Sequence, residues 1–114
     1  MKGKYQAAFI VPIGAKKILG EDGWEFESSA RLSEEIKDYL IQLLNLHFLE
    51  SYLGIESYVD DDIKMSIIFD DQNEIESIHF QLYGDSLAIL SEVCQGSRMP
   101  SEAELFIPQQ EHEQ

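Results

Sequence analysis

The stretch IKMSIIFDDQNEIESIHFQLY, residues 63–83, decides the fold. Within it, apolar side chains recur at every second position, which places them on one face of an extended chain: Ile63, Met65, Ile67 and Phe69, then Ile78, Phe80 and Leu82. The polar residues 70–73 separate the two halves as the turn of a β-hairpin does. The sequence therefore predicts two antiparallel strands, 63–69 and 75–83, with one apolar face and one mixed face.

Helical periods flank this hairpin on both sides. Before it, Ser33 has the character of an N-cap, two glutamates follow it in the first turn, and Gly54 has the character of a C-terminal stop. These signals predict a long helix over 33–53, with a second half that is apolar on more than one side. After the hairpin, Asp85 as an N-cap and a following apolar stripe predict a second helix over 85–95.

Two further strands complete the predicted order. The β-rich segments 5–11 and 103–107 give strand, helix, strand, strand, helix, strand, which is the split β-α-β order of ferredoxin-like domains. The expected fold is α+β, a small antiparallel sheet of four strands with two helices on one face. Residues 14–30 are compatible with a short hairpin or a long loop. We expect one acidic domain over 1–108 and a frayed polar tail over 109–114.

The same patterns identify candidate core residues. We expect Leu40 and Leu43 of the long helix to pack against Phe80 and Leu82 of the second hairpin strand. A Leu→Ala change at either helix position is then expected to destabilise the fold by about 2–5 kcal/mol.

The charge of the chain excludes some partners and favours others. The 114 residues carry 22 acidic and 8 basic side chains, a formal charge of −14. Residues 1–17 hold four lysines and no acid, so the rest of the chain carries 22 acids against four basic residues, or −18. Such a field repels nucleic acids and anionic lipids, and it attracts basic proteins.

A search for catalytic chemistry returns little. Cys94 is the single cysteine, it lies on the apolar side of the second helix, and no basic residue near it in sequence would activate the thiol. His47 and His79 have no second histidine or cysteine at zinc-binding spacing. The run 60–62 of three aspartates lacks the glycine and distal glutamate of a calcium loop. We expect no cofactor, no metal and no catalytic residue; a small enzyme using His47 or His79 with a carboxylate is the weaker alternative.

Two surfaces are candidates for binding a partner. One is acidic, with its members at opposite ends of the two hairpin strands, where they would rim an edge of the sheet: Glu56, Asp60, Asp61, Asp62, Asp70, Asp71, Glu74 and Glu76. The other is the face of the sheet away from the helices, where aromatic and polar residues mix as they do in protein interfaces: Gln6, Ser66, Ile68, His79, Gln81, Tyr83 and Phe106. Tyr83 and Phe106 are the expected apolar anchors.

These observations favour a binding protein over an enzyme. An acidic inhibitor can imitate the phosphates that a basic toxin such as a nuclease grips, and bacterial immunity proteins resemble this chain in size and charge. We expect a cytoplasmic inhibitor of that kind, with no membrane span and no bound nucleic acid. The alternative is a homodimeric regulatory or assembly protein that associates through the apolar helix 33–53.

Overall fold

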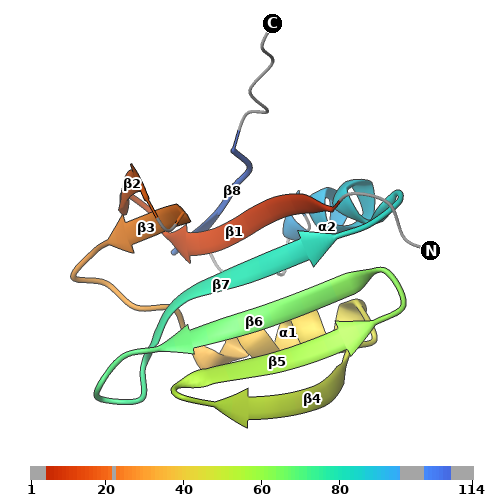
Figure 1. Ribbon diagram of the computed structural model, residues 1–114, viewed down its shortest axis with the longest axis horizontal. Helices are drawn as coiled ribbons and strands as arrows, with labels where there is room; N and C mark the ends of the chain where they lie inside the picture. Colours follow the sequence, from red (N-terminus) through yellow and green to blue (C-terminus); the bar gives the residue numbers. More distant parts are fainter. Residues whose placement is uncertain (1–4, 22, 96–101, 109–114) are drawn as a thin grey trace, which may run out of the picture.

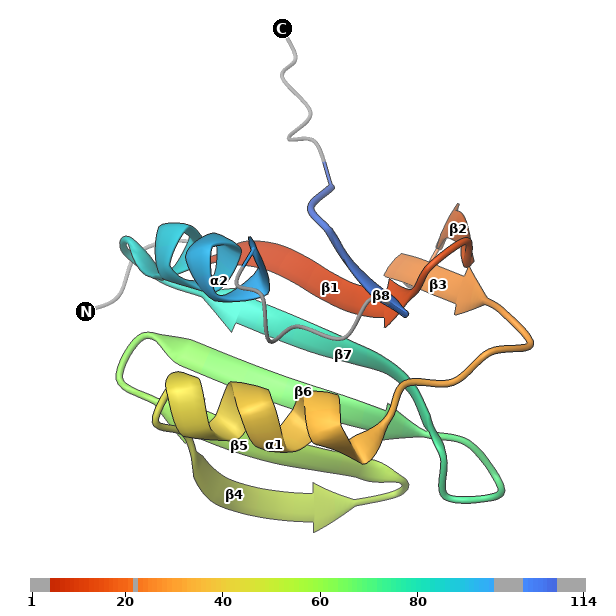
Figure 2. The ribbon, with the colours of Figure 1, turned by 180° about the vertical axis from the view of Figure 1, so that it is seen from behind.

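The computed structural model describes residues 5–21, 23–95 and 102–108, and the predicted tail 109–114 lies outside them. Within these ranges the chain forms a mixed α+β fold with two helices against one face of an antiparallel sheet (Figures 1 and 2). The elements are β1 (Gln6–Pro12), β2 (Lys16–Gly20), β3 (Gly23–Glu27), α1 (Glu34–Leu43), β4 (His47–Tyr52), β5 (Ile55–Asp60), β6 (Ile63–Phe69), β7 (Ile75–Leu82), α2 (Ser86–Gln95) and β8 (Ala103–Phe106). No helix in these ranges has both the length and the apolar character needed to cross a membrane.

The sheet is larger than the sequence predicted. Its six strands follow the order β4-β5-β6-β7-β1-β8, and every neighbouring pair is antiparallel. The four predicted strands β1, β6, β7 and β8 are all present, whereas β4 and β5 extend the sheet beyond them. The expectation of a four-stranded sheet is therefore wrong in strand number.

The β6–β7 hairpin is confirmed, and its register explains the alternating pattern. Met65 lies opposite Phe80 and Ile67 opposite Ile78, so the apolar residues of both strands share the face under the helices. The register shifts between Ile68 and Phe69, which leaves Glu76 as an extra residue on β7.

The long helix is wrong in its second half. Helix α1 ends at Leu43, because Asn45 adopts a left-handed φ of 55° and reverses the chain. The Asn45 N–H donates to the carbonyl of Gln42 and the Leu46 N–H to the carbonyl of Ile41, the paired bonds of a Schellman motif. Asparagine is the residue other than glycine that accepts this position most readily.

The rest of the predicted helix contains β4, the first strand of the β4–β5 hairpin. Leu53 and Gly54 have φ values of 52° and 78°, as the two central residues of a type I′ turn require. Gly54 therefore joins β4 to β5 instead of ending a helix. Ser33 is the N-cap of α1, as predicted, although its hydroxyl makes no capping hydrogen bond.

The main core lies between the helices and the sheet. Leu40, Phe80 and Leu82 are buried there as predicted, together with Leu90 of α2. The prediction for Leu43 is wrong, because 49% of its surface is exposed. The buried positions recur every four residues, at Ile36, Leu40 and Leu44, and Leu43 lies beside this stripe.

A second, aromatic cluster lies on the opposite face of the sheet. The ambiguous segment 14–30 contains the β2–β3 hairpin, which places Trp24 and Phe26 over Phe9 of β1 and Phe106 of β8. The Phe9 and Phe26 ring centroids are 5.1 Å apart, and those of Trp24 and Phe106 are 4.9 Å apart. The hairpin covers this face over β1 and β8 and reaches His79 of β7, and it leaves the part over β5 and β6 open (Figure 1).

Candidate functional site

The predicted acidic residues form two clusters at opposite ends of the sheet. The β5–β6 turn carries Asp60, Asp61 and Asp62, and the β6–β7 turn carries Asp71 and Glu74. The seven residues of β6 separate these turns by about 23 Å. The acids therefore do not form one continuous rim, and strand β4 at the sheet edge runs between the two acidic ends (Figure 1).

Asp70 has a role inside the fold. One of its carboxylate oxygens accepts the Arg31 Nε–H at 2.8 Å, and the other accepts the backbone N–H groups of Gln72 and Glu74. These bonds, led by that from Arg31, hold the pKa of Asp70 below its ordinary value. Glu76 lies 3.9 Å from the same guanidinium. Asp70 therefore closes the β6–β7 turn, whereas Asp71 and Glu74 remain exposed.

His79 is half-buried on the open face. Its Nε2 lies 3.0 Å from the Ser77 hydroxyl, and the Phe9 ring contacts it edge-on with centroids 4.8 Å apart. Burial lowers the pKa of the imidazole below its ordinary value, so His79 is neutral at pH 7. Ser77 is buried, and in the described part of the chain no carboxylate is hydrogen-bonded to His79. The pair therefore lacks the access and the orienting group that nucleophilic catalysis requires.

The two predicted apolar anchors, Tyr83 and Phe106, are not fully exposed to a partner. Phe106 is packed under the β2–β3 hairpin, so it belongs to the aromatic cluster and is not an open anchor. Tyr83 is half-buried, with its ring edge-on to Tyr5 at 6.0 Å, and its N–H donates to the carbonyl of Asp62.

Gln6 was expected on the open face, but it lies opposite Leu82 and so shares the helix-covered face.

The sequence missed the most apolar exposed surface, the outer strand β4. All six of its residues are exposed, and because β4 is an outermost strand, one of its edges has no neighbouring strand among the described residues. Phe48 is 60% exposed and Tyr52 69%, and the adjoining Leu49 and Leu53 are exposed as well. Glu50 is the only charged residue of this strand. We call His47–Tyr52 with Leu53 the apolar edge.

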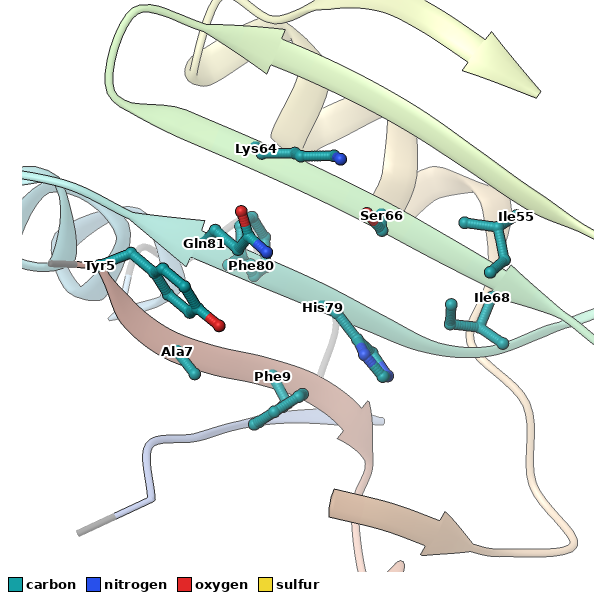
Figure 3. A pocket seen from close by; sticks show the side chains of 10 residues that line it. All are labelled: Tyr5, Ala7, Phe9, Ile55, Lys64, Ser66, Ile68, His79, Phe80 and Gln81. Atoms are coloured by element: carbon teal, nitrogen blue, oxygen red, sulfur yellow. The ribbon is translucent and has the colours of Figure 1, made fainter. Parts of the chain in front are cut away.

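A groove crosses the uncovered part of the sheet (Figure 3). It has a volume of about 310 Å³ and receives side chains from the start of β1 and from β5, β6 and β7. Lys64 lies opposite Gln81 at one end, where Tyr5 also points into the groove. Phe9, Ile68 and Ile55 line the other end. The alternating pattern of β6 and β7 correctly predicted four residues on this face: Ser66, Ile68, His79 and Gln81. The sequence did not predict that four further residues line the groove: Tyr5, Phe9, Ile55 and Lys64.

The described residues offer little for metal or thiol chemistry. Within those ranges, no three side chains among His, Cys, Asp and Glu lie close enough together to hold a metal ion. Cys94 is half-buried against the main core, and burial raises the pKa of its thiol to about 11. The thiol is therefore protonated at neutral pH and is a weak nucleophile.

Comparisons with protein-family models, with curated proteins and with solved structures found no match to this chain.

Proposed function

We propose that this protein is a non-enzymatic inhibitor that binds a basic protein through the apolar edge and the two acidic turns at its ends. The observation that carries the proposal is the exposure of Phe48 and Tyr52 on β4, the outermost strand of the described sheet, between those turns. Protein interfaces have this composition, with aromatic anchors at the centre and charged residues at the rim.

The apolar edge is large enough to anchor a partner. An aromatic side chain buries about 150–250 Å² when it is fully covered. At exposures of 60% and 69%, Phe48 and Tyr52 together offer roughly 200–320 Å² of surface, and Leu49 and Leu53 add to it. The strand pairing places the two rings on opposite faces of the sheet, because Phe48 lies opposite Tyr58 on the helix-covered face and Tyr52 lies opposite Ile55 on the open face. A partner therefore covers both rings only by enclosing the edge strand.

The charge supports a basic partner. The net charge of −14 steers a cationic protein toward the molecule, and the turn with Asp60, Asp61 and Asp62 presents three carboxylates at one end of the apolar edge. A nuclease toxin is basic because it grips phosphate, so an immunity protein acting in the cytoplasm is the specific role we propose.

The experiment separates the two parts of the interface by kinetics. With the basic protein that co-purifies from the native host, Asp60/Asp61/Asp62→Asn should slow association about tenfold at low salt and remove much of its salt dependence. Tyr52→Ser should instead accelerate dissociation. A matched control, Glu21/Glu35/Glu92→Gln, removes three exposed carboxylates from the β2–β3 turn and the two helices and should change association less.

Two results would remove the proposal. One is binding insensitive both to salt and to the changes in the β5–β6 turn and in the apolar edge. The other is a purified protein that hydrolyses nucleic acid or another substrate by itself.

The apolar edge also supports a second candidate function, a homodimeric regulator or assembly protein. An edge strand with exposed aromatic residues can pair with the same strand of another copy. In this function β4 replaces the predicted helix 33–53 as the dimer contact. Sedimentation velocity distinguishes the candidates: a dimer at micromolar concentration that Tyr52→Ser converts to a monomer favours this function over the inhibitor.

For the fold, we propose that β1, α1, β6, β7, α2 and β8 form a ferredoxin-like core elaborated by two hairpins. The support is the order β6-β7-β1-β8, in which β7 separates β6 from β1 as in a split β-α-β motif. The β2–β3 and β4–β5 hairpins then count as insertions on either side of α1. An experimental structure in which β1 and β6 are antiparallel to each other would contradict this assignment.

A further inference from the structure

We infer that the groove on the open face of the sheet is a binding site for a small amphipathic carboxylate, a molecule with an aromatic or aliphatic tail and one carboxylate. This site borders the apolar edge, because its Ile55 lies opposite Tyr52. The inference does not rest on the proposed function.

The first argument is the sign of the charge in the groove. Among the described residues, Lys64 is the only lysine or arginine that lines it, and no aspartate or glutamate does, in a chain whose net charge is −14. Among the described residues, the four ion pairs involve Lys17, Arg31 and Lys37, so the Lys64 ammonium has no carboxylate partner there. His79 is neutral and adds no second cation. A single anionic group is the complement of this arrangement.

The second argument is the polarity along the groove. At one end, the ammonium of Lys64, the amide of Gln81 and the hydroxyl of Tyr5 are donors that suit a carboxylate (Figure 3). At the other end, Ile68 lies opposite Ile55 on β5, and Phe9 of β1 is near His79. The four residue steps from Lys64 to Ile68 span about 13 Å along the strand, which is the length of a carboxylate with a tail of about eight carbons.

The third argument is size. A cavity of about 150 Å³ holds one benzene ring, so the groove at about 310 Å³ has room for a ring and a short chain. A folded protein segment would need a longer trough. The volume therefore favours a free small molecule over a peptide.

The test compares an acid with its neutral analogue. The probe is 4-phenylbutyrate, the analogue is 4-phenylbutan-1-ol, and the readout is the change in the amide chemical shifts of Ser66, His79 and Gln81 during titration. The acid should bind at least about fivefold more tightly than the alcohol, which corresponds to one partly exposed charge-assisted contact. Lys64→Met keeps most of the side-chain length and should abolish that preference.

The matched control is Lys37→Met. Lys37 lies on α1, on the other side of the sheet, where its ammonium is 3.7 Å from a Glu56 oxygen. It should leave the preference for the acid unchanged. Phe48→Ser should also leave it unchanged, because Phe48 lies opposite Tyr58 on the helix-covered face and tests the proposed interface away from the groove. Circular dichroism establishes that each variant is folded before its titration is interpreted.

Three outcomes would overturn the inference. The first is equal affinity for the acid and the alcohol, and the second is a preference that survives Lys64→Met. The third combines two results: millimolar probe causes no change in the amide chemical shifts, and Lys64→Met loses binding to the protein partner. That outcome would assign the groove to the protein interface instead.

Discussion

A pair of leucine substitutions in α1 tests which face of this helix is buried. Leu40 is 0% exposed and Leu43 is 49% exposed, although both lie in the same helix three residues apart. Leu40→Ala removes a fully buried side chain and should lower the free energy of unfolding by about 2–5 kcal/mol. Leu43→Ala removes a half-exposed side chain, so its cost should stay below about 1 kcal/mol. Since both changes are Leu→Ala in one helix, helix propensity contributes similarly to each.

Thermal unfolding followed by circular dichroism measures both variants against wild type. For a chain of this size, about 1 kcal/mol corresponds to roughly 4 °C in Tm. Leu40→Ala should therefore melt about 8–20 °C below wild type, and Leu43→Ala within about 4 °C of it. Equal losses from the two substitutions would mean that Leu43 is buried as well, as the sequence pattern predicted.

The remaining predictions concern single side chains. Asn45→Gly should leave stability nearly unchanged, whereas Asn45→Val should cost about 1–2 kcal/mol, because a β-branched residue resists a φ of 55°. Equal stabilities of the two variants in thermal melts would contradict the left-handed cap. The folded state lowers the pKa of Asp70, so the Asp70 carboxylate contributes its full stabilisation above the ordinary carboxyl pKa, and the contribution is lost as pH falls through the folded-state pKa. Asp70→Asn should therefore remove this pH dependence from the acid-unfolding curve. An unchanged curve would count against the Arg31 contact. Cys94, with a pKa of about 11, should react with iodoacetamide at pH 7.4 more than about 100-fold more slowly than a free thiol, and a rate like that of free cysteine would show that the thiol is not desolvated.

The β6–β7 hairpin could be predicted from sequence because one signal dominates it. Strict alternation puts every apolar residue of 63–69 and 78–82 on one face, and the polar residues 70–73 allow a turn at a single place. The same alternation also identified four residues that line the groove. The groove itself could not be predicted, because Phe9 and Ile55 reach it only through strand pairings that are distant in sequence.

The segment after Leu43 was misread because its apolar residues satisfy both periods. In LLNLHFLESYLG, the spacing fits a helix that is buried on several sides, and it also fits a strand at the edge of a sheet. The residues that decide between them are Asn45 and Leu53, whose positive φ values cannot be read from residue type with the certainty that glycine gives. Phe106 was misplaced for a related reason: the sequence left open whether residues 14–30 form the hairpin that covers it.

Hydrogen exchange of the complex with the basic partner tests the central claim most directly. If the apolar edge and the aspartate turn form the interface, partner binding should slow amide exchange over residues 47–53 and 60–62. Exchange in α2, which lies over β1 and β7 toward the opposite edge of the sheet from β4 (Figure 2), should stay as in the free protein. Protection confined to α1 and α2, with the amides of β4 exchanging as fast as before, would contradict the account.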